Sequence, residues 1–428
     1  MPALKRLGPP ALVLLLAIAV GTSTGKLFTE SDTSHYLHLA AGQPVAQPFA
    51  ARQLAPLIVR ALTHLGLSIH AGFWLLGIAS LTFFIATTAF LLNHPNPGAP
   101  PSATALSSIR VGRSATNLQP PITTPTWLLC SILGLYFWPL QFAGMVLPDL
   151  FYAALLSGFL LLIRANRYGW ASAMLLPLMV ARESTILVLL CWLYVAWTTL
   201  TWSKRLFSIA ATAAGAGIVR YLAAGSGGNR EGLGPILYLL GKIPWNFAKN
   251  FLGLEPWANL NPACGVPTWH HALALGPLHD IGFCKVEPDY PVRTVAYALA
   301  TFGLLPLLLW WVRNTNAPGL LARFCLIYGT AAFLMAGLLG YSVQRLYGYG
   351  WPAFLVGLPL LISTATFRSR GWAAGFVALN LLGSWLEWRI DKLPLLVAEL
   401  LVWAFGFWLL RQGWTGARND TQRLREAR

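Results

Sequence analysis

Long uncharged apolar runs recur along the whole chain, and they constrain its fold more than any other feature. A helical run of about twenty such residues matches the hydrocarbon thickness of a bilayer. Only 10% of the 428 residues are charged, against about 25% in soluble proteins, and 56% are hydrophobic. We therefore predict an all-α, polytopic membrane protein.

Basic residues set the expected orientation of the spans. Lys and Arg gather in short clusters between the apolar runs, and such clusters favour the cytoplasmic side. Lys5 and Arg6 precede the first apolar run, 11–20, which we interpret as a retained span and not as a cleaved signal peptide. The net charge of +16 is therefore a topology signal and does not indicate nucleic-acid binding.

Hydropathy and basic clusters together predict about 12 transmembrane helices with both termini cytoplasmic. Two short helices are expected within 168–203. A single long helix there would move Lys204 to the outer side and invert every later span. The predicted spans are 11–20, 67–92, 127–147, 150–163, two within 168–203, 206–223, 292–312, 320–341, 351–366, 372–386 and 393–410.

The spans group into two membrane modules. Residues 1–222 form an N-terminal module of about seven spans, with a first outer loop at 26–66. Residues 223–291 form a large extracytoplasmic loop, and 292–428 form a variable C-terminal module of about five spans. The segment 93–125, rich in Pro, Ser and Thr, is typical of a flexible cytoplasmic linker.

Acidic residues are scarce, and most of them fall at the predicted outer face. Acids contribute little to the orientation rule, so this distribution is a partly independent observation. Only Asp420 and Glu426 fall inside, and Glu399 lies within the last span. The outer acids are Glu30, Asp32, Asp149, Glu183, Glu231, Glu255, Asp280, Glu287, Asp289, Glu387 and Asp391.

The first outer loop places acids, a histidine and an arginine in a short stretch that ends in an amphipathic helix. Asp32, His35 and Arg52 lie in the loop, and apolar residues then recur at helical spacing over 54–65. A helix of this kind is expected in the membrane interface, before a stop at Gly66. The combination indicates a site for a phosphate-bearing lipid. The alternative is a solvated loop followed by a surface helix.

Two acids are candidates for catalysis. Displacement at an anomeric carbon needs a base for the acceptor's proton and cations for the leaving phosphate. Asp32 is the first candidate for the base, and the alternative is that it caps a helix beginning at Thr33. Asp149 follows Pro148 at the start of a span. It either faces Asp32 and binds the acceptor or a metal, or it caps a helix.

Three further charged residues are candidates for substrate binding. Arg182 and Glu183 lie where the two short spans meet, and ionisable groups at membrane depth usually face a partner or a cavity. Their pairing with each other or with other spans is the structural alternative. Arg345 lies among aromatic residues at the outer face. It either binds a lipid phosphate or anchors a helix among the head groups.

The cysteines and histidines carry weaker signals. A disulfide between Cys264 and Cys284 is expected if the large loop faces an oxidising compartment, and two free thiols are the alternative. His270 and His271 are adjacent but lack a third ligand, so we predict no metal site there. The chain has no zinc-ligand spacing, Walker loop, dinucleotide-binding fingerprint or nucleophile elbow.

With these residues in place, the chain resembles the GT-C superfamily of integral membrane glycosyltransferases. It is similar to bacterial members related to protein mannosyltransferases and lipid A aminoarabinose transferases. The likeness rests on Asp32-Thr-Ser-His35-Tyr36 in the first outer loop, on the helix from Arg52 to Leu65, and on Asp149. That family often has two adjacent acids in this loop, whereas here the near neighbour of Asp32 is Glu30.

The resemblance implies an enzyme that transfers a sugar from a polyprenyl-phosphate donor to an extracytoplasmic glycan, lipid or protein. It implies that Asp32 is the base and that the enzyme lies in the bacterial inner membrane with an extracytoplasmic active site. The need for a divalent cation stays open. We expect catalysis by Asp32 and Asp149, and substrate binding by Arg52, Arg182, Glu183, Arg345, His35 and Tyr36.

Two other functions fit the sequence. A transporter or flippase of lipid-linked glycans would need polar groups along a path through the spans, and Arg182, Glu183 and Glu399 are the obvious ones. The second alternative is a polymerase or ligase of surface polysaccharide, which would use diphosphate-linked oligosaccharides. The large predicted outer loops are also consistent with this function.

Overall fold

The computed structural model describes residues 32–45, 49–93, 140–224 (without 141 and 144), 235–257, 282–307 (without 305), 319–339, 343–353 and 370–413 (without 388). Within these ranges the chain forms α-helices, one 3-10 helix and one pair of short strands. The all-α prediction is confirmed for the described part of the chain, apart from the small strand pair.

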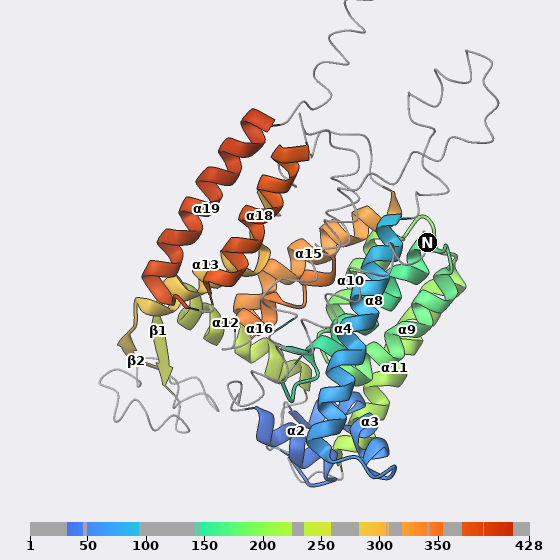
Figure 1. The fold of residues 1–428 in the computed structure, drawn as a ribbon. Helices are drawn as coiled ribbons and strands as arrows, with labels where there is room; N and C mark the ends of the chain where they lie inside the picture. The colour runs from blue at the N-terminus through green and yellow to red at the C-terminus, as the bar shows by residue number, and fades with distance from the viewer. Residues whose placement is uncertain are drawn as a thin grey trace, which may run out of the picture.

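The first described helices lie together at one end of the N-terminal bundle, the lower end in Figure 1. They are α2 (Thr33–Ala40), η1 (Phe49–Ala51) and α3 (Leu54–Thr63). α3 starts where the predicted amphipathic helix starts and ends near its predicted stop. Gly66 has φ +90, a left-handed conformation that only glycine adopts without strain.

α3 buries a narrow face fully against the protein and leaves most of its predicted apolar stripe only partly accessible. Ala55 and Val59 are buried, and a Cβ added at Gly72 of the following helix would lie 2.9 Å from Val59 Cγ1. Leu65, at the end of the stripe, is 79% exposed. An interfacial helix needs such an outward apolar stripe.

Among the described residues, five helices form the N-terminal bundle, whose arrangement can be followed in Figure 1. α4 packs along α8, and α11 packs along α9. The apolar faces of α8, α9, α10 and α15 enclose a core that includes Tyr152, Phe159 and Trp192. The helices are α4 (Ile69–Asn93), α8 (Asp149–Arg164), α9 (Tyr168–Ala181), α10 (Thr185–Val195) and α11 (Trp202–Ala224).

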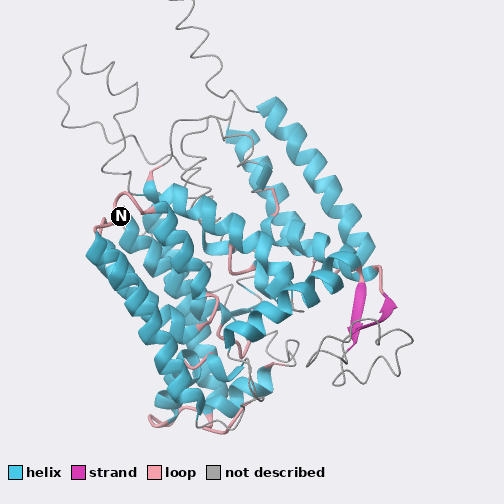
Figure 2. Ribbon diagram, turned by 180° about the vertical axis from the view of Figure 1, so that it is seen from behind, coloured by secondary structure: helices cyan, strands magenta, loops and turns pink. Residues whose placement is uncertain are grey.

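The remaining elements form a second group beside this bundle, as Figures 1 and 2 show. α13, α18 and α19 pack on one another, and α15 contacts α8 and α10, so it joins the two groups. The elements are α12 (Pro235–Leu252), β1 (Leu254–Trp257), β2 (Gly282–Val286), α13 (Asp289–Phe302), α15 (Leu320–Leu339), α16 (Val343–Tyr347), α18 (Arg370–Leu386) and α19 (Lys392–Gly413).

The strand pair was not predicted from the sequence. β1 and β2 pair antiparallel, with Leu254 opposite Val286 and an irregularity between Glu255 and Pro256. Proline lacks the N–H that a regular ladder needs, which accounts for a bulge at this point. Both strands belong to the loop 223–291, which also contains α12.

Four described helices, α4, α11, α15 and α19, are long and apolar enough to cross a membrane. They match the predicted spans 67–92, 206–223, 320–341 and 393–410. α9 and α10 confirm that 168–203 holds two helices instead of one. At about 1.5 Å per residue they are shorter than a hydrocarbon core of about 30 Å. The full set of 12 spans is not shown, and the first span, 11–20, lies outside the described residues.

One predicted span is interrupted. α13 begins at Asp289 and ends at Phe302, so the segment 292–312 is not a single helix. Gly303 has φ +52, and the N–H of Leu304 donates to Asn380 Oδ1 at 2.7 Å. A left-handed glycine and a side-chain acceptor thus end the helix, and hydropathy alone does not reveal either.

Candidate functional site

Three acids and three arginines from four separate parts of the chain meet in one place, which we call the charge cluster. Asp32 and Arg52 come from the first loop, and Asp149 opens α8. Because the formal charges cancel, the cluster can be buried at moderate cost. Its members are Asp32, Arg52, Asp149, Arg182, Glu183 and Arg345, all six predicted from the sequence as catalytic or substrate-binding residues.

Arg345 of α16 bridges the two candidate catalytic acids. Its Nη1 donates to Asp32 Oδ2, and its Nη2 donates to Asp149 Oδ2 at 3.0 Å. Its Nε–H is buried and has no hydrogen-bond partner among the described residues. The guanidinium therefore holds Asp32 and Asp149 together while one of its donors stays unused.

Asp149 is fully buried and both of its oxygens accept hydrogen bonds. Oδ1 accepts from Arg182 Nη1 at 3.0 Å and from the Tyr349 hydroxyl, while Oδ2 accepts from Arg345. α8 does begin at Asp149, but the structure shows no side-chain cap at the start of this helix. The carboxylate therefore binds two cations and a phenol instead of capping.

Tyr349 is a member of this site that the sequence analysis missed. The guanidinium carbon of Arg182 lies 3.9 Å from the centroid of the Tyr349 ring, which is within the range of a cation–π interaction. The Tyr349 carbonyl also accepts a hydrogen bond from the Tyr328 hydroxyl at 3.1 Å. No local signal marked Tyr349, because it lies beyond the end of α16 and reaches the cluster only through the tertiary fold.

The Arg52–Glu183 ion pair joins the first loop to the turn between α9 and α10. Arg52 Nη2 lies 2.8 Å from Glu183 Oε1, and Arg52 Nε donates to both carboxylate oxygens. Arg52 Nη1 donates to the Tyr36 hydroxyl at 2.8 Å. Of the alternatives for Arg182 and Glu183, the structure shows pairing with other segments: Arg182 with α8 and Glu183 with the loop.

The electrostatic environment of Glu183 favours its charged form. Burial by itself raises the pKa of this carboxyl, but the charges of Arg52 and Arg182 and the hydrogen bond from Arg52 outweigh burial. The pKa of Glu183 falls from 4.5 to about 2. Glu183 is therefore ionised at neutral pH and is a fixed partner of Arg52.

Asp32 is the most accessible acid of the charge cluster. Its side chain is 22% exposed, against 16% for Glu183 and 0% for Asp149. α2 begins at Thr33, as the capping alternative predicted, but the Asp32 side chain makes no cap hydrogen bond. Asp32 is therefore the acid of the cluster that a molecule in the surrounding solvent can reach most easily.

The two aromatic candidates of the first loop lie beside the charge cluster and share a partner in η1. The His35 ring stacks on Phe49 with centroids 4.2 Å apart, and Tyr36 meets Phe49 edge-on at 5.9 Å. Phe49 also lies 5.7 Å from the Arg52 guanidinium carbon. Phe49 thus orders this side of the site, a role that sequence reasoning did not assign.

The remaining candidate residues belong to the large loop 223–291. Cys284 lies in β2, but Cys264, His270 and His271 lie outside the described residues, so the disulfide stays a prediction. No group of three His, Cys, Asp or Glu side chains within the described ranges forms a metal site.

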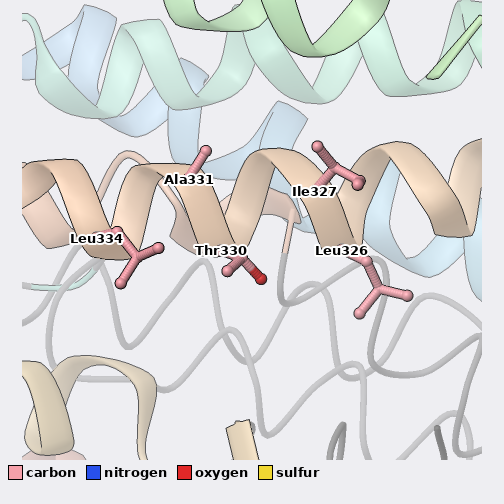
Figure 3. A pocket seen from close by; sticks show the side chains of 5 residues that line it. All are labelled: Leu326, Ile327, Thr330, Ala331 and Leu334. Carbon is pink, nitrogen blue, oxygen red and sulfur yellow. The ribbon is translucent and has the colours of Figure 1, made fainter. Parts of the chain in front are cut away.

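An apolar pocket lies on one face of α15 (Figure 3). Four apolar residues and one threonine line it, so its lining offers no charged group to act as an acid or a base. The charge cluster is therefore the stronger candidate for a catalytic site. The lining residues are Leu326, Ile327, Thr330, Ala331 and Leu334.

Glu399 is a separate buried acid in the C-terminal group of helices. It is fully buried, and both carboxylate oxygens lack a hydrogen-bond partner among the described residues. A Cβ added at Gly383 of α18 would lie 3.2 Å from Glu399 Oε2, so the absence of a side chain there makes room for the acid. Glu399 lies in α19, one of the helices that are long and apolar enough to cross a membrane.

The chain matches no family model, no curated protein and no solved structure. What the structure shows is a helical protein with four helices, among its described residues, that are able to cross a membrane. The function has to be argued from the geometry and chemistry of the charge cluster.

Proposed function

We propose that the protein is an integral membrane glycosyltransferase of the GT-C type, which moves a sugar from a polyprenyl-phosphate donor to an extracytoplasmic acceptor. It would sit in a bacterial inner membrane with about 12 spans and both termini in the cytoplasm. The observation that carries the proposal is the bridge from Arg345 to Asp32 and Asp149 within a cluster that holds two more arginines. Acids and cations of this kind are the two elements that displacement at a phosphate-linked sugar requires.

In this reaction the acceptor hydroxyl attacks the anomeric carbon while the bond from that carbon to the phosphate oxygen breaks. The hydroxyl proton passes to Asp32, and the electron pair of the broken bond leaves with the polyprenyl phosphate. Asp32 suits the role of base because its carboxylate is the most accessible one in the cluster. Arg345 suits the role of phosphate ligand because it adjoins Asp32 and guanidinium groups bind phosphate oxygens well.

Asp149 and Glu183 contribute indirectly, because they hold the arginines that bind the phosphate. Asp149 has no exposed surface, so we assign it the role of a positioning residue that fixes Arg182 and Arg345. Glu183 fixes Arg52 in the same way. The arginines are thereby pre-organised, and a site whose cations are already in place needs little reorganisation when charge develops on the leaving phosphate.

The test is donor cleavage in proteoliposomes. A panel of radiolabelled polyprenyl-monophosphate sugars is offered to the wild type, to Asp32→Asn and to Asp391→Asn. Asp391 is a matched control because it also pairs with an arginine, Arg293, at 3.2 Å, in a different part of the molecule.

We expect the wild type and Asp391→Asn to cleave at least one donor at similar rates. The rate of Asp32→Asn should fall by about 10²- to 10⁴-fold, the usual contribution of a general base. If Asp32→Asn cleaves as fast as the wild type, Asp32 is not the base. If the wild type cleaves no donor in the panel, the transferase proposal fails.

A flippase of lipid-linked glycans is the second candidate, and Glu399 is the observation that favours it. A buried acid without a described partner in a helix able to cross the membrane is typical of a polar pathway. In the same proteoliposomes, transbilayer movement of a labelled lipid-linked sugar without bond cleavage would support the flippase. Cleavage of diphosphate-linked but not monophosphate-linked donors would instead indicate a polysaccharide polymerase or ligase.

A further inference from the structure

We infer that the donor phosphate and Asp32 compete for Arg345, so that binding of the donor releases the catalytic base. Asp32 is held by Arg345 in the structure, and the phosphate would take its place on the guanidinium. This release matters for catalysis only if the transferase function proposed above holds. Until a donor binds, Asp32 would stay paired with Arg345 and would not act as the base.

The two acids on Arg345 differ in how easily they can be replaced. Asp149 is fully buried and is held by Arg182 and by the Tyr349 hydroxyl as well as by Arg345. Asp32 is 22% exposed, so an anion arriving from outside can reach its contact with Arg345. Asp149 therefore keeps the guanidinium in place while Asp32 is exchanged.

Arg345 also has capacity for one more acceptor than the protein supplies. Its Nε–H is buried without a partner among the described residues, and an unused buried donor is unfavourable. A phosphate brings several acceptor oxygens, whereas the protein offers this guanidinium one oxygen each from Asp32 and Asp149. Binding of the donor phosphate would therefore be favoured, because its additional oxygens can accept the hydrogen bond that Arg345 Nε–H does not make in the described part of the structure.

The exchange changes what Asp32 can do. The Asp32 oxygen that Arg345 holds is Oδ2, which accepts a hydrogen bond from Nη1. Once a phosphate takes this place on Arg345, Oδ2 can accept the proton of the sugar acceptor instead. The same guanidinium then stabilises the leaving phosphate.

The test is the equilibrium binding of polyprenyl monophosphate, which carries no sugar and cannot react, in neutral phosphatidylcholine vesicles. Competition predicts that Asp32→Asn and Asp32→Ala bind this lipid more tightly than the wild type. If Arg345 is free of Asp32 in about a tenth of wild-type molecules, the gain is about tenfold. The alanine variant excludes a gain caused by new hydrogen bonds from asparagine.

Two controls make this result specific. Asp391→Asn removes the same charge from another Asp–Arg pair, and we expect wild-type binding. Arg345→Gln should bind weakly, and adding Asp32→Asn to Arg345→Gln should bring no gain. If the Asp32 variants bind the lipid no more tightly than Asp391→Asn does, the competition is refuted.

Two further arms identify the source of the phosphate. Inorganic phosphate and vesicles that contain phosphatidylglycerol replace polyprenyl phosphate in the same measurement. A gain restricted to polyprenyl phosphate supports release by the donor. An equal gain with free phosphate or phosphatidylglycerol contradicts donor-specific release.

Donor cleavage, measured in parallel, separates the two ideas. Cleavage by the wild type without tighter binding by the Asp32 variants would leave the transferase function intact and refute the release. Tighter binding by those variants without any cleavage would retain the competition at Arg345 and refute the transferase function.

Discussion

Replacement of Asp149 by asparagine should destabilise the folded protein strongly. The substitution preserves the shape of the side chain but removes the charge that two buried arginines share. Arg182 Nη1 and Arg345 Nη2 each lie 3.0 Å from an Asp149 oxygen, and one of these donors would then face an amide NH₂. The charge of the cluster would change from zero to +1.

The size of the effect follows from burial. Asp149 has no exposed surface, and Arg182 and Arg345 are 3% and 4% exposed in their side chains, so water cannot replace the lost contacts. Removing one partner from a buried ion pair costs about 3–5 kcal/mol. Tyr349→Phe removes only the hydroxyl donor to Asp149, and it should cost less, about 1.5–3 kcal/mol for a hydrogen bond to a charged group.

The assay is reversible denaturant unfolding of the purified protein in mixed micelles. Asp391→Asn is the matched control, because its pair with Arg293 is 40–47% exposed and exposed pairs contribute at most about 1 kcal/mol. We expect the loss of stability to decrease in the order Asp149→Asn, Tyr349→Phe, Asp391→Asn. A loss for Asp149→Asn no larger than that of Asp391→Asn would refute the view that a buried ion network holds this site together.

The pH dependence of unfolding should report Glu183. Its folded pKa of about 2 lies below its ordinary value of 4.5, so its contribution is complete above about pH 4.5 and is lost as pH falls toward 2. The difference corresponds to about 3 kcal/mol, and Glu183→Gln should lack this acid slope; equal slopes in the two proteins would contradict the assignment. Two glycines of α11 should respond oppositely to alanine. A Cβ at Gly215 would lie 2.8 Å from Met179 Cβ and 2.9 Å from the Leu176 carbonyl, whereas a Cβ at Gly217 would meet nothing within 4 Å. Gly215→Ala should cost about 1–3 kcal/mol of stability and Gly217→Ala should add up to about 1 kcal/mol, and equal unfolding midpoints would show that α11 does not pack on α9 through Gly215.

Most of the helices could be predicted from the sequence because hydropathy is a local property. α4, α11, α15 and α19 coincide closely with predicted spans, and α3 starts at the predicted residue. The failures occur where a distant contact intervenes. α13 ends at Gly303 beside Asn380, and the strand pair joins residues about thirty positions apart, so no local pattern marks either feature.

The members of the candidate site could also be predicted, for a reason specific to membranes. Burying a charge in an apolar environment is costly, and Arg182 and Glu183 were selected on this ground. Asp32, Arg52, Asp149 and Arg345 were selected instead as residue types that could bind or transform a phosphate-bearing lipid. The structure brings all six together. Tyr349 was missed because an interfacial tyrosine is common in membrane proteins and nothing local distinguishes this one.

The sequence by itself therefore determined the helical class of the chain, the place of its long apolar helices and the set of charges that needed partners. Only the tertiary structure decided which charges pair. Arg345 is 313 residues from Asp32 and 196 residues from Asp149, and the sequence analysis left open whether it bound a lipid phosphate or anchored a helix. The physical reason is that hydropathy and charge act on each segment separately, whereas an ion pair depends on how α8, α9 and α16 pack.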